Sequence, residues 1–340
     1  MRASVFLLVL SVVTSASLCP TTSVSSESPR DITRTIHIDG FERSYLLHLP
    51  PKTHSITKLP LLIMLHGRGA SSQSAANDFG WTEKADKEGF IVAFPQALPF
   101  DPGRPSGIRL PDDFTRYWRI PTNDSFWWTN GMAARYAYLA NPKYPRVVHP
   151  VDTPFLFALL HDVLQRYEAD PRRVFVVGFS NGGYMAANFA QAASEKIAGV
   201  GIVGWIGPGR PRQLAHPLSV FLSIGTDDGF GQPTQTDWKS MPPIIKKEWY
   251  GQETLPTLEE DVTAWARLDQ CKSHNTTSTA WGKQIDWTDC LNHTRVRGFS
   301  VSHLEHEWPG SKPSRWNRVH HAEQPLNLTD VIWEFLQPVR

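Results

Sequence analysis

The residues whose types and spacing point most directly to chemistry form a G-x-S-x-G stretch, Gly178-Phe179-Ser180-Asn181-Gly182. A mostly apolar run over 173–177 predicts a buried strand directly before it, and the residues that follow predict a helix. This order is typical of a nucleophile elbow, a sharp turn that exposes a serine hydroxyl. Glycines fit the turn because side chains at those two positions would collide across it. The pattern therefore predicts that Ser180 is a nucleophile rather than part of a structural glycine turn.

A serine hydroxyl is a weak nucleophile at neutral pH, so it needs a base that accepts its proton and an acid that orients the base. After an elbow, the acid and then a histidine follow in the chain, each at the end of a strand. Asp227 and Asp228 both follow the predicted strand 218–224, and chain order alone leaves either as the acid. His306 follows the last predicted strand and is the candidate base, with nearby His303 as its rival.

The negative charge that develops on an attacked carbonyl oxygen needs hydrogen-bond donors, which form an oxyanion hole. The N–H of Asn181, where the helix begins, is one candidate. The second donor is expected from the loop after an early strand, and the Arg68 N–H in His66-Gly67-Arg68 is our candidate. We expect His66 itself to pack and hydrogen-bond under this loop rather than to do chemistry.

The composition argues against several other function classes. The formal net charge of the 340 residues is +1, so summed charge cannot hold nucleic acid or an anionic membrane. No later stretch reaches about 18 uninterrupted apolar residues, so no membrane span is predicted. His320 and His321 point apart and have no cysteine or acidic cluster beside them, so no metal is predicted, and no cofactor motif is present. We expect a monomer.

The amino-terminal residues have the pattern of a secretory signal. Arg2 gives a positive start, an apolar run covers 5–13, and small residues follow at 14–17. Residues 1–17 are therefore predicted to be a signal peptide, which implies a secreted, extracellular protein. Residues 18–32 are rich in Ser, Thr and Pro and are predicted to be a flexible lead-in.

Export from the cell would also permit disulfide bonds and N-linked glycosylation. Cys271 and Cys290 lie close together in sequence, and export would permit a disulfide between them, which leaves Cys19 removed or free. Four N-x-S/T acceptor patterns favour a secreted glycoprotein. They begin at Asn123, Asn275, Asn292 and Asn327.

Strands alternate with helices along residues 33–340, which predicts one α/β domain with a mostly parallel central sheet and helices on both faces. The predicted strands are 33–38, 42–49, 59–65, 90–94, 173–177, 200–203, 218–224 and 296–302, and the predicted helices are 81–88, 153–167, 181–192, 258–268 and 328–336.

Residues 97–150 fit no regular pattern and are rich in aromatic side chains, which is typical of an ordered functional loop. Trp118, Trp127 and Trp128 in this insertion, together with Trp308 beside the candidate base, are predicted either to flank the acyl group or to belong to the core.

Several motifs together resemble one family, the polyhydroxybutyrate depolymerase and feruloyl esterase group of secreted esterases with the α/β-hydrolase fold. The resemblance covers roughly residues 33–337. The matching pieces are Arg43-Ser-Tyr-Leu-Leu-His-Leu-Pro50, Leu65-His-Gly67, Asp170-Pro-Arg-Arg-Val174, Gly178-Phe-Ser-Asn-Gly-Gly-Tyr-Met-Ala186, Gly225-Thr-Asp-Asp228 and His306-Glu-Trp-Pro-Gly310.

The resemblance implies that the acid is Asp228 rather than Asp227, that the base is His306, and that the family's paired cysteines are Cys271 and Cys290. The chain departs from the family pattern at Leu304-Glu305, where glycines are usual, at Gly229, where proline is usual, and in its longer aromatic insertion. These departures bear on the choice of substrate more than on catalysis.

The residues thus predict a serine hydrolase that works through an acyl-enzyme, and the resemblance implies that it cleaves carboxylic esters. The resemblance implies two substrate classes, aliphatic hydroxyacid polyesters and hydroxycinnamate esters on polysaccharide. A peptidase of the same fold is one alternative, because the same three groups cleave amides. A non-catalytic secreted binding protein is the other, although the intact Ser, Asp and His candidates favour an enzyme.

Overall fold

The computed structural model describes residues 30–38, 40–51, 58–98, 125–127, 152–206, 213–229, 239, 257–312 and 326–338. The predicted signal peptide, most of the lead-in and several predicted residues lie outside these ranges. These residues are Cys19, Trp118, Asn123, Trp128, His320 and His321. Within the described ranges, no helix is long and apolar enough to cross a bilayer.

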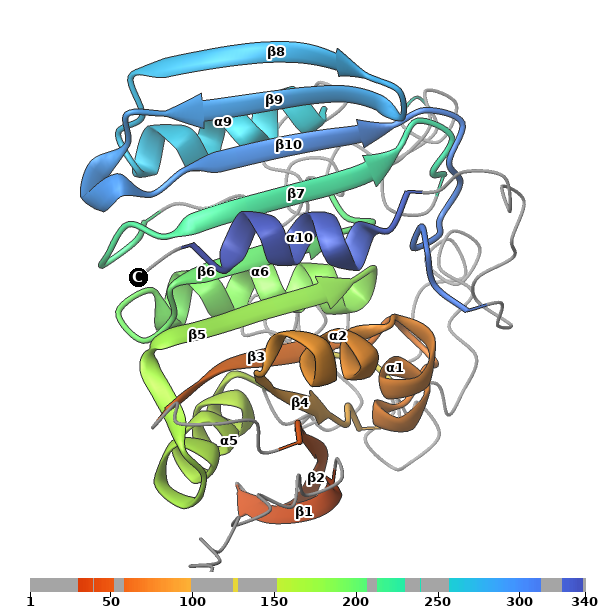
Figure 1. Ribbon diagram of the computed structural model, residues 1–340, viewed down its shortest axis with the longest axis vertical. Helices are drawn as coiled ribbons and strands as arrows, with labels where there is room; N and C mark the ends of the chain where they lie inside the picture. Colours follow the sequence, from red (N-terminus) through yellow and green to blue (C-terminus); the bar gives the residue numbers. More distant parts are fainter. Residues whose placement is uncertain are drawn as a thin grey trace, which may run out of the picture.

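A sheet of ten strands runs through the middle of the described chain, in the order β1-β2-β4-β3-β5-β6-β7-β10-β9-β8 (Figure 1). The stretch from β4 to β10 is parallel, whereas β1, β2, β9 and β8 pair antiparallel at the two ends. The bounds are β1 (Arg30–Ile38), β2 (Phe41–Leu49), β3 (Leu59–Leu65), β4 (Ile91–Pro95), β5 (Ala169–Phe179), β6 (Gly199–Val203), β7 (Ser219–Gly225), β8 (Ser273–Thr279), β9 (Gly282–Thr288) and β10 (Val296–Val301).

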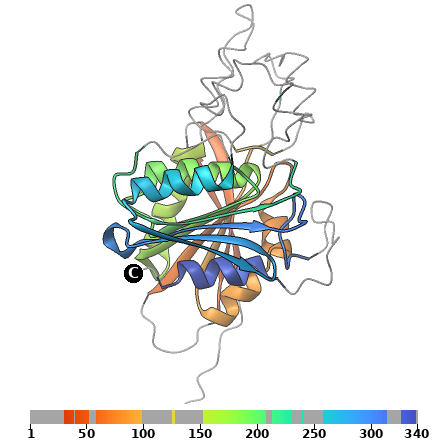
Figure 2. The same ribbon diagram turned by 90° about the horizontal axis from the view of Figure 1, so that it is seen from above.

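Helices cover both faces of the sheet, as the two views in Figures 1 and 2 show. One face carries α1 (Ser72–Asp78), α2 (Trp81–Glu88) and α10 (Leu328–Leu336), and the other carries α5 (Asp152–Arg166), α6 (Asn181–Ala193) and α9 (Leu258–Leu268). Successive residues of β5 alternate between the two resulting cores, Val174 and Val176 in one and Phe175 and Val177 in the other. Burial on both faces explains why such strands are nearly continuous apolar runs.

The predicted α/β class, with a mostly parallel sheet between two layers of helices, is confirmed. The predicted lead-in is too long at its end, because β1 begins at Arg30 and pairs with β2 along its whole length. Neither α1 nor the β8–β9 hairpin was predicted from the sequence. All seven side chains of β8 are exposed, so this strand has no apolar alternation to detect.

The hairpin is tied to the end of α9 by the predicted disulfide, which joins Cys271 to Cys290. Asp269 caps the same end of α9 and is fully buried. Its carboxylate accepts hydrogen bonds from the Leu218 N–H at 3.3 Å and from the Thr294 hydroxyl at 3.0 Å. Burial raises the pKa of Asp269 from the ordinary 3.8 to about 7, because the interior disfavours its charged form.

This carboxyl predicts a specific dependence of stability on pH. Between pH 3.8 and about 7, Asp269 stays protonated in the folded state and ionises in the unfolded state, so its contribution to stability is present below this window and lost across it as the pH rises. We expect the free energy of unfolding of the native chain to fall, relative to that of Asp269→Asn, as the pH rises through the window. Urea unfolding of both proteins at several pH values measures the difference, and parallel curves would contradict the assignment.

Candidate active site at the carboxyl edge of the sheet

Ser180 lies in the turn between β5 and α6, with φ 57° and ψ −122°, a conformation that is strained for a residue with a side chain. Two backbone hydrogen bonds hold it there. The Ser180 N–H donates to Val203 O at 2.8 Å, and the Tyr184 N–H donates to Ser180 O at 3.0 Å. The turn therefore depends on β6 on one side and on the first turn of α6 on the other.

The two glycines of the motif are required by close approaches of backbone. A Cβ atom on Gly178 would lie 2.1 Å from Gly182 O, and a Cβ atom on Gly182 would lie 2.2 Å from Leu65 O at the end of β3. Neither contact can be relieved by moving a side chain, because the facing atoms are backbone. This geometry is the physical reason for the G-x-S-x-G spacing.

The structure brings Ser180, His306 and Asp228 together in one hydrogen-bonded chain. His306 Nε2 lies 2.8 Å from Ser180 Oγ, and His306 Nδ1 lies 2.8 and 2.9 Å from the two carboxylate oxygens of Asp228. An ionised carboxylate can only accept, so Nδ1 carries the proton and Nε2 is left to accept the one on Ser180. The Asp228 side chain is 1% exposed and that of His306 18%, so the chain runs from the interior to a surface that a substrate can reach.

The two loops that carry Asp228 and His306 follow neighbouring parallel strands, β7 and β10, and they bond to each other. The Asp227 N–H donates to Leu304 O at 3.0 Å, and the His303 N–H donates to the Thr226 hydroxyl at 2.8 Å. The two rival candidates, Asp227 and His303, lie at the exposed surface, where His303 Nδ1 is 3.8 Å from Asp227 Oδ2. They are not part of the hydrogen-bonded series that ends at Ser180.

The His306 ring lies against Phe179, with ring centres 4.9 Å apart and the planes tilted by 28°. Gly204 lies close to both of these rings and has φ +62°. A Cβ atom there would lie 2.9 Å from Phe179 Cε2 and 3.2 Å from His306 Cε1. Sequence reasoning missed both residues, because Phe179 is a variable position of the motif and Gly204 contacts the base only after the fold brings β6 and β10 into one sheet.

Trp308 was predicted either to flank the acyl group or to belong to the core, and the structure places it in the core. It is 1% exposed and packs on Phe79 with ring centres 4.9 Å apart. Its indole N–H donates to the Thr329 hydroxyl at 3.0 Å, which in turn donates to Phe79 O at 2.6 Å. Trp308 thus anchors the histidine loop to α10 and α1, and its burial agrees with the second of the two predicted roles rather than with a substrate contact.

The candidate oxyanion loop lies beside the nucleophile, since a Cβ atom on Gly67 would be 3.4 Å from Ser180 Cβ. Gly67 O accepts hydrogen bonds from His66 Nδ1 at 2.8 Å and from the Ala70 N–H at 3.3 Å. The N–H and C=O of a trans peptide point in opposite directions, so the Arg68 N–H points away from the His66 ring. The orientation of this donor is therefore set by the ring of His66.

His66 can hold that orientation only as a neutral ring. Its Nδ1–H donates to Gly67 O, and its Nε2 accepts from the Ala97 N–H at 3.2 Å. Full burial lowers the pKa of His66 from 6.5 to about 4, because the interior penalises the imidazolium. The prediction that His66 packs and hydrogen-bonds under the loop agrees with these contacts.

Asn181 is the first residue of α6, so its N–H is one of the helix donors that lack an intrahelical acceptor. Its side chain is buried and bonds to the main chain of Trp127. Trp127 is itself fully buried, so it too is placed in the core rather than at a surface that a substrate contacts.

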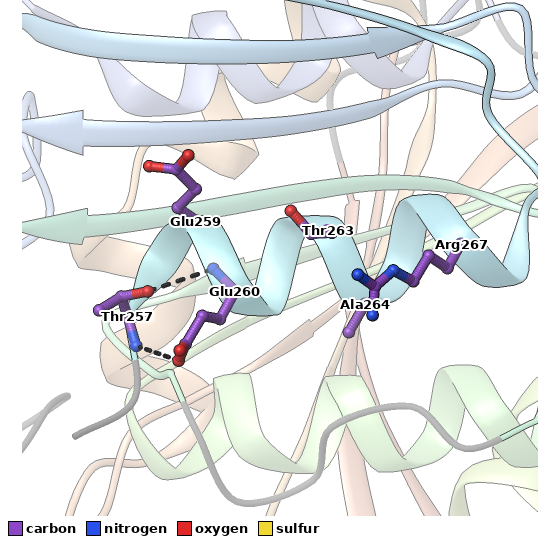
Figure 3. A pocket seen from close by; sticks show the side chains of 6 residues that line it. All are labelled: Thr257, Glu259, Glu260, Thr263, Ala264 and Arg267. Carbon is purple, nitrogen blue, oxygen red and sulfur yellow. Dashed lines mark hydrogen bonds between the residues drawn. The ribbon is translucent and has the colours of Figure 1, made fainter. Parts of the chain in front are cut away.

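A separate hollow lies on the outer face of α9 (Figure 3). It is lined by Thr257, Glu259, Glu260, Thr263, Ala264 and Arg267. Thr257 and Glu260 are already paired in the capping box that begins the helix, with both bonds at 3.2 Å. Neither Ser180 nor its two partners line this hollow, so it is not the candidate site.

No family model matches the chain, but comparisons with known proteins find relatives in sequence and in structure. The putative esterase NocK of Nocardia uniformis subsp. tsuyamanensis is 24% identical over 317 residues, which cover 89% of this chain and 81% of that protein. The bifunctional acetylxylan esterase/xylanase XynS20E of Neocallimastix patriciarum is 20% identical over 268 residues, 79% of this chain but only 31% of that protein.

Among solved structures, an acetyl xylan esterase from Aspergillus awamori matches with a TM-score of 0.54 and 12% identity, over 90% of this chain and 99% of that one. This likeness shows the fold. The chain has the α/β-hydrolase fold, and its relatives in sequence are described as esterases. The strands β3, β5, β7 and β10 present the candidate oxyanion loop, Ser180, Asp228 and His306 at one edge of the sheet.

The closeness of Gly204 to His306 predicts a variant that displaces the His306 ring while Ser180, His306 and Asp228 all keep their side chains. We expect Gly204→Ala to lower kcat for ester hydrolysis about 10- to 100-fold, because small misplacements of catalytic groups carry costs of that order. The measurement is the initial rate of hydrolysis of a short p-nitrophenyl ester.

Gly89→Ala is the matched control. Gly89 has φ +74°, but nothing lies within 4 Å of a Cβ atom there. Both variants should lose about 1–2 kcal/mol of stability from left-handed backbone strain, and only Gly204→Ala should lose rate. Equal kcat in the two variants would remove the proposed link between Gly204 and the base.

Proposed function

We propose that this chain is a secreted serine carboxylesterase that works through an acyl-enzyme on Ser180, with His306 as base and Asp228 as the orienting acid. One observation carries the proposal, the unbroken hydrogen-bonded chain from buried Asp228 through His306 to Ser180 Oγ. The kinship with esterases supports the choice of an ester bond rather than a peptide bond.

In the first half of the reaction, Ser180 Oγ attacks the ester carbonyl carbon as its proton passes to His306 Nε2. Asp228 accepts the Nδ1–H throughout and stabilises the imidazolium that forms. The Arg68 and Asn181 N–H groups donate to the new oxyanion. When the tetrahedral intermediate collapses, the C–O bond to the alcohol breaks and His306 Nε2 gives its proton to the leaving oxygen.

In the second half, water takes the place of the alcohol. His306 Nε2 accepts a proton from the water as its oxygen attacks the acyl carbon. Collapse of this second intermediate breaks the bond to Ser180 Oγ, which recovers its proton from His306. The products are a carboxylic acid and an alcohol, and the enzyme returns to its starting state.

For the substrate we propose carboxylic esters borne by a polysaccharide. This choice is supported by the relative from Neocallimastix patriciarum and the structure from Aspergillus awamori, both described as acetylxylan esterases. The resemblance to feruloyl esterases supports the same class of alcohol with a larger acyl group. Hydroxyacid polyesters are the competing substrate class that the sequence resemblance implies.

Secretion is supported by the signal-like residues 1–17 and by the Cys271–Cys290 disulfide, since disulfides persist in oxidising compartments. We further propose glycans on Asn275 and Asn292, two exposed acceptor residues beside that disulfide. Asn327 is exposed as well, but its side-chain oxygen accepts from the Asp330 N–H to cap α10.

Ser180→Ala should lower kcat by several orders of magnitude, on the scale of about 10⁴- to 10⁶-fold seen when triad members are removed. The native protein should react with a fluorophosphonate probe, whereas Ser180→Ala should not. The measurements are ester turnover and probe labelling on the same preparations. Near-native turnover by the alanine variant would refute the proposed nucleophile, and an unreactive native protein would favour a binding module.

The two neighbouring acid–histidine pairs provide a matched comparison. Asp228→Asn should lose about 10⁴-fold in kcat, because the amide no longer holds the imidazole in the required tautomer. Asp227→Asn and His303→Ala should keep kcat near the native value, since this exposed pair does not reach Ser180. Loss of rate in the Asp227 variant with retention in the Asp228 variant would reverse the assignment.

A hydrolysis panel tests the substrate class. Acetylated xylan, methyl ferulate, hydroxybutyrate oligomers and a peptide anilide would be compared by kcat/KM. We expect xylan acetate or the ferulate ester to be the best substrate and the anilide to remain uncut. A clear preference for the hydroxybutyrate oligomers would replace the polysaccharide proposal with a polyester one and leave the serine mechanism in place.

A further inference from the structure

Trp127 contacts both elements that carry a candidate oxyanion donor, the start of α6 and the loop after β3. Its main-chain N–H donates to Asn181 Oδ1 at 2.7 Å, and Asn181 Nδ2 donates back to Trp127 O at 3.4 Å. Its indole N–H donates to His66 O at 2.8 Å, and its ring lies 5.1 Å from the His66 ring. One residue of the insertion is thus bonded to the elbow and to the oxyanion loop at once.

The neighbours of Trp127 add to this link. Gly69, in the oxyanion loop, donates its N–H to Ser125 O at 2.9 Å, and the Ser125 hydroxyl donates to Ala70 O at 2.5 Å. The Phe126 N–H donates to Leu98 O at 3.0 Å, just beyond β4. The short segment 125–127 is therefore bonded to the loop after β3, to the chain after β4 and to the start of α6.

These contacts matter because the two proposed donors belong to different elements. The Asn181 N–H belongs to α6, and the Arg68 N–H belongs to the loop after β3, so the spacing between them depends on how those two elements are fixed to each other. Donors of an oxyanion hole contribute most when they are held in place before the charge develops. Trp127 is fully buried, and hydrogen bonds shielded from water hold groups more firmly than exposed ones.

We propose that Trp127 is a positioning residue of the oxyanion hole, which fixes the Arg68 donor relative to the Asn181 donor through its bonds to His66 and Asn181. This inference rests on the proposed function. It assigns to Trp127 a role in transition-state stabilisation rather than in contact with the acyl group.

The test compares two esters that differ in one atom, 4-nitrophenyl acetate and its thiono analogue, in which sulfur replaces the carbonyl oxygen. Sulfur is a weak hydrogen-bond acceptor, so the thiono ester gains little from the oxyanion donors. The ratio of kcat for the oxo ester to kcat for the thiono ester therefore reports on the hole itself. A merely structural role would lower both rates together.

Trp127→Phe keeps an aromatic ring and removes the bond to His66 O. We expect kcat for the oxo ester to fall roughly 10- to 100-fold, less than the 10²–10³ reported for removing a donor outright, with KM little changed. The kcat ratio should fall about tenfold, because the thiono ester loses less. A benzothienylalanine at the same position, which retains the shape of the indole and lacks its N–H, should give the same change in ratio even if the phenylalanine variant folds poorly.

Trp333→Phe is the matched control. Trp333 is buried in the core on the opposite face of the sheet, stacked on Phe90 at 3.8 Å. It should lower thermal stability and leave the oxo-to-thiono ratio at the native value. If Ser180→Ala is inactive but the oxo-to-thiono kcat ratio is unchanged in both Trp127 variants, the inference about Trp127 is overturned and the proposed function stands. An active Ser180→Ala would instead overturn the proposed function.

Discussion

The close contact of backbone at the serine turn is the constraint on which the rest of the site depends. Gly182 approaches the end of β3 so closely that a Cβ atom would lie 2.2 Å from Leu65 O. That approach brings the oxyanion loop beside Ser180, whose strained backbone is in turn held by Val203 of β6. Three neighbouring parallel strands therefore define one turn. The contacts that they supply offset the free-energy cost of the strained conformation.

The proposed base and the proposed Arg68 donor lie on loops, and buried tryptophans fix both of those loops to the core. Trp308 connects the histidine loop to α10 through Thr329, on one face of the sheet. Trp127 connects the oxyanion loop to α6, on the other face. Each indole N–H has an acceptor, as buried indoles usually do, so both rings supply apolar packing and a directed bond. The two loops are thus held by the cores on opposite faces of the sheet.

The sequence predicted those parts of the fold that have a local signal. Apolar runs identified the central strands within a few residues, and the elbow was visible because its strand, turn and helix are contiguous in the chain. The β8–β9 hairpin could not be predicted from periodicity, because the side chains of β8 are all exposed. Chain order could not separate Asp228 from Asp227, since their difference lies in which histidine each one faces. Trp127 bonds to Asn181, which is 54 residues away in the chain, and to His66, which is 61 residues away. Contacts over such separations cannot be predicted from a local sequence pattern.

Burial of His66 connects the chemistry of the site to the stability of the fold. With the ring neutral, Nδ1–H fixes Gly67 O and Nε2 accepts from Ala97. A second proton would turn Nε2 into a donor that faces another donor, so it would disrupt the loop that carries Arg68. Because the folded pKa of about 4 lies below the ordinary 6.5, the contribution of His66 to stability is present above 6.5 and is lost as the pH falls toward 4. Acid therefore weakens the fold through the same ring that orients the proposed oxyanion donor.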